Sequence, residues 1–144
     1  HEDHIIKVME CFNDSKTEFA TIAQKLNSSD NLPKDKVFLV KDTFNFALYF
    51  SRYPIPFVRE DEIKEDANEF HQHIGIYGYT IIALEKFQQL KPSKLEINEK
   101  LEQLRWLENG GKIKVGTTIY PSFPVDTLED LISIRKVYAS KGHL

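Results

Sequence analysis

The chain has 144 residues, of which 41% are hydrophobic and 28% charged, enough apolar side chains for one ordinary core. The formal net charge is only -3, with Lys and Arg scattered among Asp and Glu, which argues against nucleic acid or an acidic membrane surface as a partner. No apolar run approaches the ~18 residues of a membrane span, and the start, His1-Glu2-Asp3-His4, does not resemble a signal peptide. We therefore expect one globular unit, residues 1–144, in the cytoplasm.

The first predicted element is a helix that begins at Asp3, a residue able to cap it, and ends near Asn13. Its apolar positions recur at helical spacing: Ile5, Ile6, Val8, Met9 and Phe12. Cys11 is the only cysteine and lies on this stripe, so it cannot form an intrachain disulfide. We expect a buried, inert thiol there.

Three strands are predicted next, over residues 19–23, 36–40 and 46–50. The second and third are separated by a short turn, which indicates a hairpin. Two prolines within residues 53–57 fix two φ angles and remove two hydrogen-bond donors. That segment should be extended and should lie outside the sheet.

The acidic stretch 60–69 has little hydrophobic periodicity, which is typical of a solvated helix or a loop, with a lid as the functional alternative. Residues 73–79 then predict a strand. The apolar pattern of residues 81–90 predicts a helix that Pro92 ends.

Ser93 and Glu96 have the spacing of a capping box and predict one further helix, ended by residues 109–111. Its apolar stripe would consist of Ile97, Leu101, Leu104 and Leu107. Residues 112–119 predict a strand with Ile113 and Val115 on one face.

Thr127 and Asp130 would cap a last helix, whose apolar residues are Leu128, Leu131, Ile134 and Tyr138. Helices and strands therefore interleave along the chain. The predicted class is α/β, with the hairpin making the sheet mixed.

Two arginines could capture an anion. Arg52 stands at the end of a predicted strand, and Arg59 follows the stiff proline segment. Guanidinium groups in such places suit bidentate binding of a carboxylate or phosphate. Two ordinary surface arginines are the alternative.

The strand at residues 73–79 carries polar groups on one face. Its period of two places His73, Gly75 and Tyr77 together, with Ile74 and Ile76 opposite. The glycine leaves room between an imidazole and a phenol, both of which can hydrogen-bond sugar hydroxyls. A solvent-facing side of the strand is the alternative.

Glu102 and Gln103 lie beside the apolar stripe of a predicted helix, where spacing alone indicates surface residues. Asp126 follows a rigid, proline-containing approach and directly precedes the last helix. A carboxylate at such a junction can hold Mg²⁺, although capping of the helix explains it equally well.

Several segments, taken together in order and spacing, resemble the bacterial 3-deoxy-manno-octulosonate (Kdo) cytidylyltransferases, also called CMP-Kdo synthetases. The resemblance covers nearly the whole chain. Its clearest parts are residues 47–52, 54–56, 73–79, 101–105, 125–127 and 129–131.

The resemblance implies an enzyme that transfers CMP from CTP to Kdo, releases pyrophosphate and requires Mg²⁺. It also implies that the product is used in lipopolysaccharide synthesis and that the enzyme is a homodimer. It also implies the Rossmann-like fold of nucleotide-diphospho-sugar transferases, of which this chain would be the mixed-sheet part without the amino-terminal nucleotide-binding strands. No catalytic residue is predicted within the chain.

The positions that match the family pattern have implied roles. Asp126 would bind Mg²⁺. The Kdo site would be lined by Arg52, Arg59, His73, Tyr77, Glu102 and Gln103.

Two departures from the pattern bear on activity. Residues 122–124 replace the glycine-flanked approach to the metal-binding aspartate that is usual in the family, and the glycine-rich nucleotide loop has no counterpart in this sequence. We expect the chain alone to be inactive. The alternatives are a non-catalytic sugar-acid-binding or assembly module, or a cytidylyltransferase for a sialic acid-like sugar.

Overall fold

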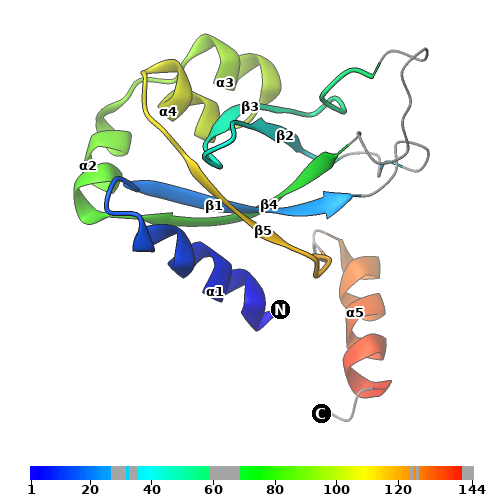
Figure 1. Cartoon of the computed structure of the whole chain (residues 1–144). Helices are drawn as coiled ribbons and strands as arrows, with labels where there is room; N and C mark the ends of the chain where they lie inside the picture. Colours follow the sequence, from blue (N-terminus) through cyan, green and yellow to red (C-terminus); the bar gives the residue numbers. More distant parts are fainter. Residues whose placement is uncertain (27–31, 33–35, 59–68, 124, 126, 141–144) are drawn as a thin grey trace.

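A five-stranded mixed sheet lies at the centre of the computed structural model, which describes residues 1–26, 32, 36–58, 69–123, 125 and 127–140 (Figure 1). In sheet order the strands are β3 (Ala47–Ser51), β2 (Phe38–Lys41), β4 (Phe70–Tyr79), β1 (Phe19–Leu26) and β5 (Lys114–Thr118). The helices are α1 (Glu2–Glu10), continued by a 3₁₀ turn at Cys11–Asn13, then α2 (Ile81–Gln89), α3 (Lys94–Glu99), α4 (Gln103–Glu108) and α5 (Leu128–Ser140). The predicted α/β class is confirmed.

The strand directions agree with the prediction of a mixed sheet. β1 pairs antiparallel with β4 and parallel with β5, while β2 pairs antiparallel with both β4 and β3. The predicted hairpin is therefore the β2–β3 pair. The two prolines beyond it lie outside the sheet, as predicted, and the Ile55–Pro56 peptide bond is cis.

The turn of the β2–β3 hairpin folds back onto the start of β5. The Asp42 side chain accepts hydrogen bonds from the backbone N–H groups of Phe44 and Phe46, which stabilises the turn. The N–H of Ala47 then donates to the carbonyl of Ile113 at 2.8 Å. The sheet is thereby curled so that its two outer strands meet at one end.

Apolar side chains cover both faces of the sheet. On one face, α2 and α4 pack on Phe19, Leu39, Phe50, Ile113 and Val115. Phe19 lies in the middle of an aromatic group, 4.1 Å from Tyr79 and 5.9 Å from Trp106 between ring centroids. On the other face, α1 and the following turn cover a smaller cluster that contains Ala20, Ile22 and Ile74.

Helix α1 differs from the prediction in its cap and in its buried face. His1 is the N-cap residue, because its ring accepts a hydrogen bond from the N–H of Asp3. The Asp3 carboxylate instead accepts from Thr118 at the end of β5. The residues buried against the sheet are His4, Val8 and Cys11, while Ile5, Ile6 and Met9 are exposed. The expected burial of the Cys11 thiol is confirmed.

The helix predicted after Ser93 is two helices. The capping box is present, but Lys100 adopts a left-handed conformation with φ of 55° and ends α3. The chain then turns and resumes as α4. Because of this turn, Leu101 and Leu104 are buried, whereas Ile97 is exposed.

Helix α5 lies beyond the end of β5 rather than over the middle of the sheet (Figure 1). Its predicted cap is confirmed, since Thr127 and Asp130 exchange hydrogen bonds in both directions. Much of its apolar surface is exposed, notably Leu128, Ile132 and Tyr138. Within the part of the chain that the structure describes, no helix has both the length and the apolar character to cross a bilayer.

Candidate functional site

A bulge in β4 shapes the candidate site. Thr21 of β1 lies opposite Tyr77, but the next residue, Ile22, lies opposite Ile74, so Gly75 and Ile76 have no opposite residue on β1. In a regular strand, side chains four residues apart would be separated by about 13 Å. Here the rings of His73 and Tyr77 are 5.5 Å apart.

A pocket of about 290 Å³ opens beside this bulge. It lies between the start of β2, β4, the α3–α4 turn and the segment after β5. Its lining brings together three of the predicted residues, His73, Tyr77 and Gln103. The other lining residues are Lys36, Val37, Gln72, Ile74, Gly75, Leu101 and Ser122.

His73 is held by specific contacts within the pocket wall. Its Nε2 lies 3.0 Å from the Thr21 hydroxyl, and its ring meets Phe50 edge-on at 5.0 Å. Burial lowers the pKa of His73 to about 4. The imidazole is therefore neutral at physiological pH.

The two tyrosines of β4 remain protonated. Burial raises the pKa of Tyr77, with smaller contributions from Tyr79 and Glu102. Burial also raises the pKa of Tyr79 to about 12, with a smaller contribution from Glu102. Tyr77 keeps 38% of its surface exposed. Its hydroxyl can therefore donate or accept a hydrogen bond at the pocket.

Gln103 has an unsatisfied donor. The residue is only 3% exposed, and its Nε2 has no hydrogen-bond partner among the described residues. A buried amide without a partner is costly, so native proteins rarely retain one. A ligand oxygen in the adjoining pocket would satisfy this group.

Among the predicted residues that the structure describes, Arg52 and Glu102 do not line the pocket. The Arg52 guanidinium donates to the carbonyls of Glu99 and Lys100 at 2.7 and 3.1 Å, at the carboxyl end of α3. Glu102 is exposed at the start of α4. Arg59, Asp126 and the acidic stretch considered as a lid lie outside the described residues, apart from Glu69.

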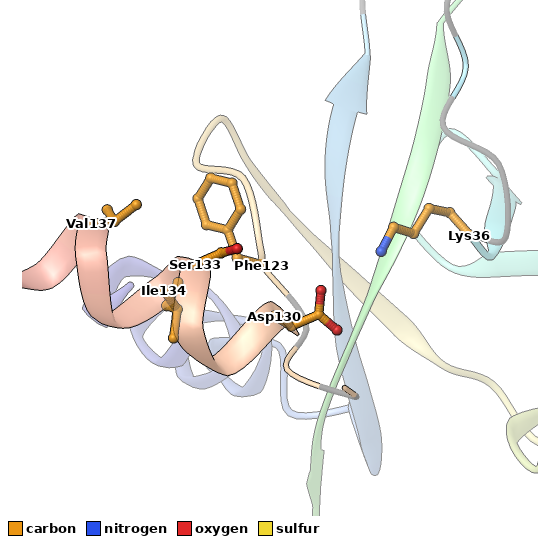
Figure 2. A pocket seen from close by; sticks show the side chains of 6 residues that line it. All are labelled: Lys36, Phe123, Asp130, Ser133, Ile134 and Val137. Carbon is orange, nitrogen blue, oxygen red and sulfur yellow. The ribbon is translucent and has the colours of Figure 1, made fainter. Parts of the chain in front are cut away.

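Lys36 lines the pocket but was not predicted from the sequence. It lines the pocket beside β4 and also a neighbouring pocket of about 370 Å³ against α5. Figure 2 shows its ammonium group and the Asp130 carboxylate pointing toward one another across that second pocket, with Phe123 and Ile134 on the α5 side. A single lysine that precedes a strand has no sequence signal that distinguishes it from a surface residue.

No metal centre is formed by the residues that the structure describes: among them, no three His, Cys, Asp or Glu side chains are grouped closely enough to hold an ion. Asp126, the residue predicted to bind Mg²⁺, is not one of them. Its carboxylate is a suitable donor for Mg²⁺ by chemistry alone.

Comparison with known proteins gives a consistent picture. The sequence pattern of a cytidylyltransferase family matches residues 1–113. The chain is 48% identical over 132 residues to the 3-deoxy-manno-octulosonate cytidylyltransferase of Thermodesulfovibrio yellowstonii, covering 90% of this chain and 51% of that protein. The enzyme of the same name from Parabacteroides distasonis is 41% identical over 140 residues, covering 91% and 55%.

A solved structure of CMP:2-keto-3-deoxy-manno-octonic acid synthetase complexed with CTP has the same fold. It superimposes with a TM-score of 0.84 at 30% identity, over 97% of this chain and 56% of that one. The chain therefore spans about half the length of the curated relatives it matches.

Proposed function

The chain belongs to the cytidylyltransferase family, and on that premise we propose that it is the sugar-acid-binding part of an enzyme that transfers CMP from CTP to Kdo. The reaction releases pyrophosphate and supplies lipopolysaccharide synthesis. The observation that carries the proposal is the pocket beside β4, which joins three residues of the implied Kdo site.

The pocket chemistry suits a polyhydroxylated ligand. Gln103 offers an unsatisfied N–H donor, neutral His73 offers one ring nitrogen as acceptor, and the Tyr77 hydroxyl can do either. A volume of about 290 Å³ is near the lower end of ordinary ligand pockets, about 300 Å³, which suits a monosaccharide. These residues would hold and orient the sugar for attack on the nucleotide.

Cations near the pocket would recognise the acid group of the sugar. Lys36 lines the pocket and makes no ion pair with any residue that the structure describes. Arg52, Arg59 and Glu102 remain predicted ligand residues. Arg52 would have to release its contacts with α3, or bind through its remaining N–H groups.

Two further parts of the proposal come from family membership. Asp126 would hold Mg²⁺, which when bound neutralises charge on the reacting phosphate. The whole protein would be a cytoplasmic homodimer. Sedimentation equilibrium of this 16.8-kDa chain at several concentrations tests the dimer, and a monomer at every concentration would exclude it as the dimerising part.

Isothermal titration of the chain with Kdo tests the central proposal. We expect binding of Kdo and weaker binding of an analogue in which an alcohol replaces the carboxylate, because the cations then lose their partner. No heat of binding from any sugar acid at millimolar concentration would overturn the proposal. Preference for a sialic acid over Kdo would assign a different sugar to the same pocket.

A further inference from the structure

One buried hydroxyl beside the pocket has more hydrogen-bond partners than protons. Thr21 of β1 is fully buried, at 0% exposure. Its Oγ1 lies 2.8 Å from the carbonyl oxygen of Ile76, 3.4 Å from that of Ile74 and 3.0 Å from Nε2 of His73. These contacts determine where the imidazole carries its proton.

The assignment follows from the chemistry of each partner. A carbonyl oxygen can only accept, so the one proton of the Thr21 hydroxyl goes to the nearer carbonyl, that of Ile76. The Oγ1 atom then has only lone pairs left for His73. Its neighbour Nε2 must therefore donate, which leaves Nδ1 of the neutral ring without a proton.

The bulge explains why a hydroxyl is needed at this position. Gly75 and Ile76 have no opposite residue on β1, so the carbonyl of Ile76 takes its hydrogen bond from the Thr21 side chain. The irregularity that brings Tyr77 beside His73 thus also orients the Thr21 hydroxyl. No described residue forms a hydrogen bond with Nδ1 of His73.

From these contacts we propose that Thr21 is a positioning residue of the pocket: it holds His73 in the Nε2-protonated tautomer, so that Nδ1 faces the ligand as an acceptor. The ligand part of this inference rests on the proposed function. An acceptor at Nδ1 selects a hydroxyl, which can donate, and disfavours a carboxylate, which cannot. The sugar acid would therefore bind with a hydroxyl at His73 and its carboxylate directed elsewhere.

Nitrogen-15 NMR of the labelled chain near neutral pH tests the tautomer without any ligand. The wild-type chain and Thr21→Ser should both show His73 with Nε2 protonated and Nδ1 unprotonated. Thr21→Val should lose this single tautomer. Thr17→Val is the matched control, because Thr17 is also buried but its hydroxyl has no partner among the described residues.

A proton on Nδ1 in the wild-type chain would overturn the proposal, and so would an unchanged tautomer in folded Thr21→Val. If that variant does not fold, the wild-type and Thr21→Ser spectra still decide the question.

Titration with Kdo tests the consequence for binding. Thr21→Val should weaken binding about tenfold, the value of one hydrogen bond, and Thr21→Ser should restore it. The loss should be equal for Kdo and for its carboxylate-free analogue, and a loss confined to Kdo would overturn the inferred orientation. If the wild-type chain binds no sugar acid, the proposed function fails while the tautomer result stands on its own.

Discussion

Gln103 places an unsatisfied amide donor on the wall of a pocket, so its contributions to stability and to binding should have opposite signs. In Gln103→Met the side chain keeps its length but loses the buried N–H group. We expect the free energy of unfolding to stay unchanged or rise by about 1 kcal/mol, while Kdo affinity falls about tenfold. Urea denaturation and calorimetric titration measure the two effects.

Gln89→Met, at the exposed end of α2, is the control and should change neither quantity. A large loss of stability in Gln103→Met would show that the amide has a structural partner.

The neutral state of His73 gives the stability of the chain a defined pH dependence. Burial lowers its pKa from 6.5 to about 4, so between these values the unfolded state binds a proton that the folded state does not. The free energy of unfolding should therefore fall as the pH drops from about 6.5 to about 4, by on the order of 3 kcal/mol if the whole shift is realised.

The test is urea denaturation of the wild-type chain and His73→Gln across that pH window. The variant should show the smaller decline with falling pH. The pKa of His71 is lowered by burial in the same direction, so some decline should remain in the variant. Parallel pH profiles would contradict the prediction.

Two glycines of β4 should respond differently to the same substitution. A Cβ at Gly75 has open space around it, whereas one at Gly78 would come within 2.7 Å of the Phe12 ring and 2.8 Å of Val8. Gly78→Ala should therefore destabilise the chain by about 1–3 kcal/mol, because α1 must shift away from the sheet.

Gly75→Ala should leave stability nearly unchanged but reduce Kdo affinity, because Gly75 lines the pocket. The thermal midpoint and the titration of each variant check the pair. Equal destabilisation by both substitutions would show that the bulge itself requires glycine.

The sequence predicted those elements whose formation depends on residues close to one another in the chain. The capping box of Ser93 and Glu96 and the β2–β3 hairpin are present as expected. The break at Lys100 was not predicted, because neither glycine nor proline marks it and the apolar spacing runs through it. Tertiary packing of Leu101 and Leu104 decides that turn.

The sequence predicted which residues of the candidate site share a face of β4. It did not predict the contacts that the site residues make with segments distant in the sequence. The alternation of β4 correctly placed His73 and Tyr77 on one face, and their approach depends on a bulge that only the pairing with β1 reveals. Thr21 and Lys36 carry no local signal at all. The contact of Arg52 with α3 joins segments far apart in sequence, so no spacing rule could anticipate it.

We expect this chain to bind the sugar acid without catalysing the transfer of CMP. The sequence holds six glycines, and none is part of a glycine-rich loop of the kind that cradles nucleotide phosphates. The isolated chain with CTP, Kdo and Mg²⁺ should therefore release no pyrophosphate in a coupled assay. Ordinary turnover would contradict this expectation and would locate a nucleotide site within these 144 residues.

The strand order also governs how this chain reaches its fold. β1 precedes both of its sheet neighbours, β4 and β5, in the chain, while the strand that follows it in sequence pairs elsewhere. Its backbone edges therefore stay unpaired until β4 and β5 have been synthesised. Such non-local pairing slows folding to milliseconds or longer and leaves an apolar strand, Phe19–Leu26, open to association with other nascent chains. Yield should consequently depend on how slowly the chain is synthesised and how well chaperones shield that strand.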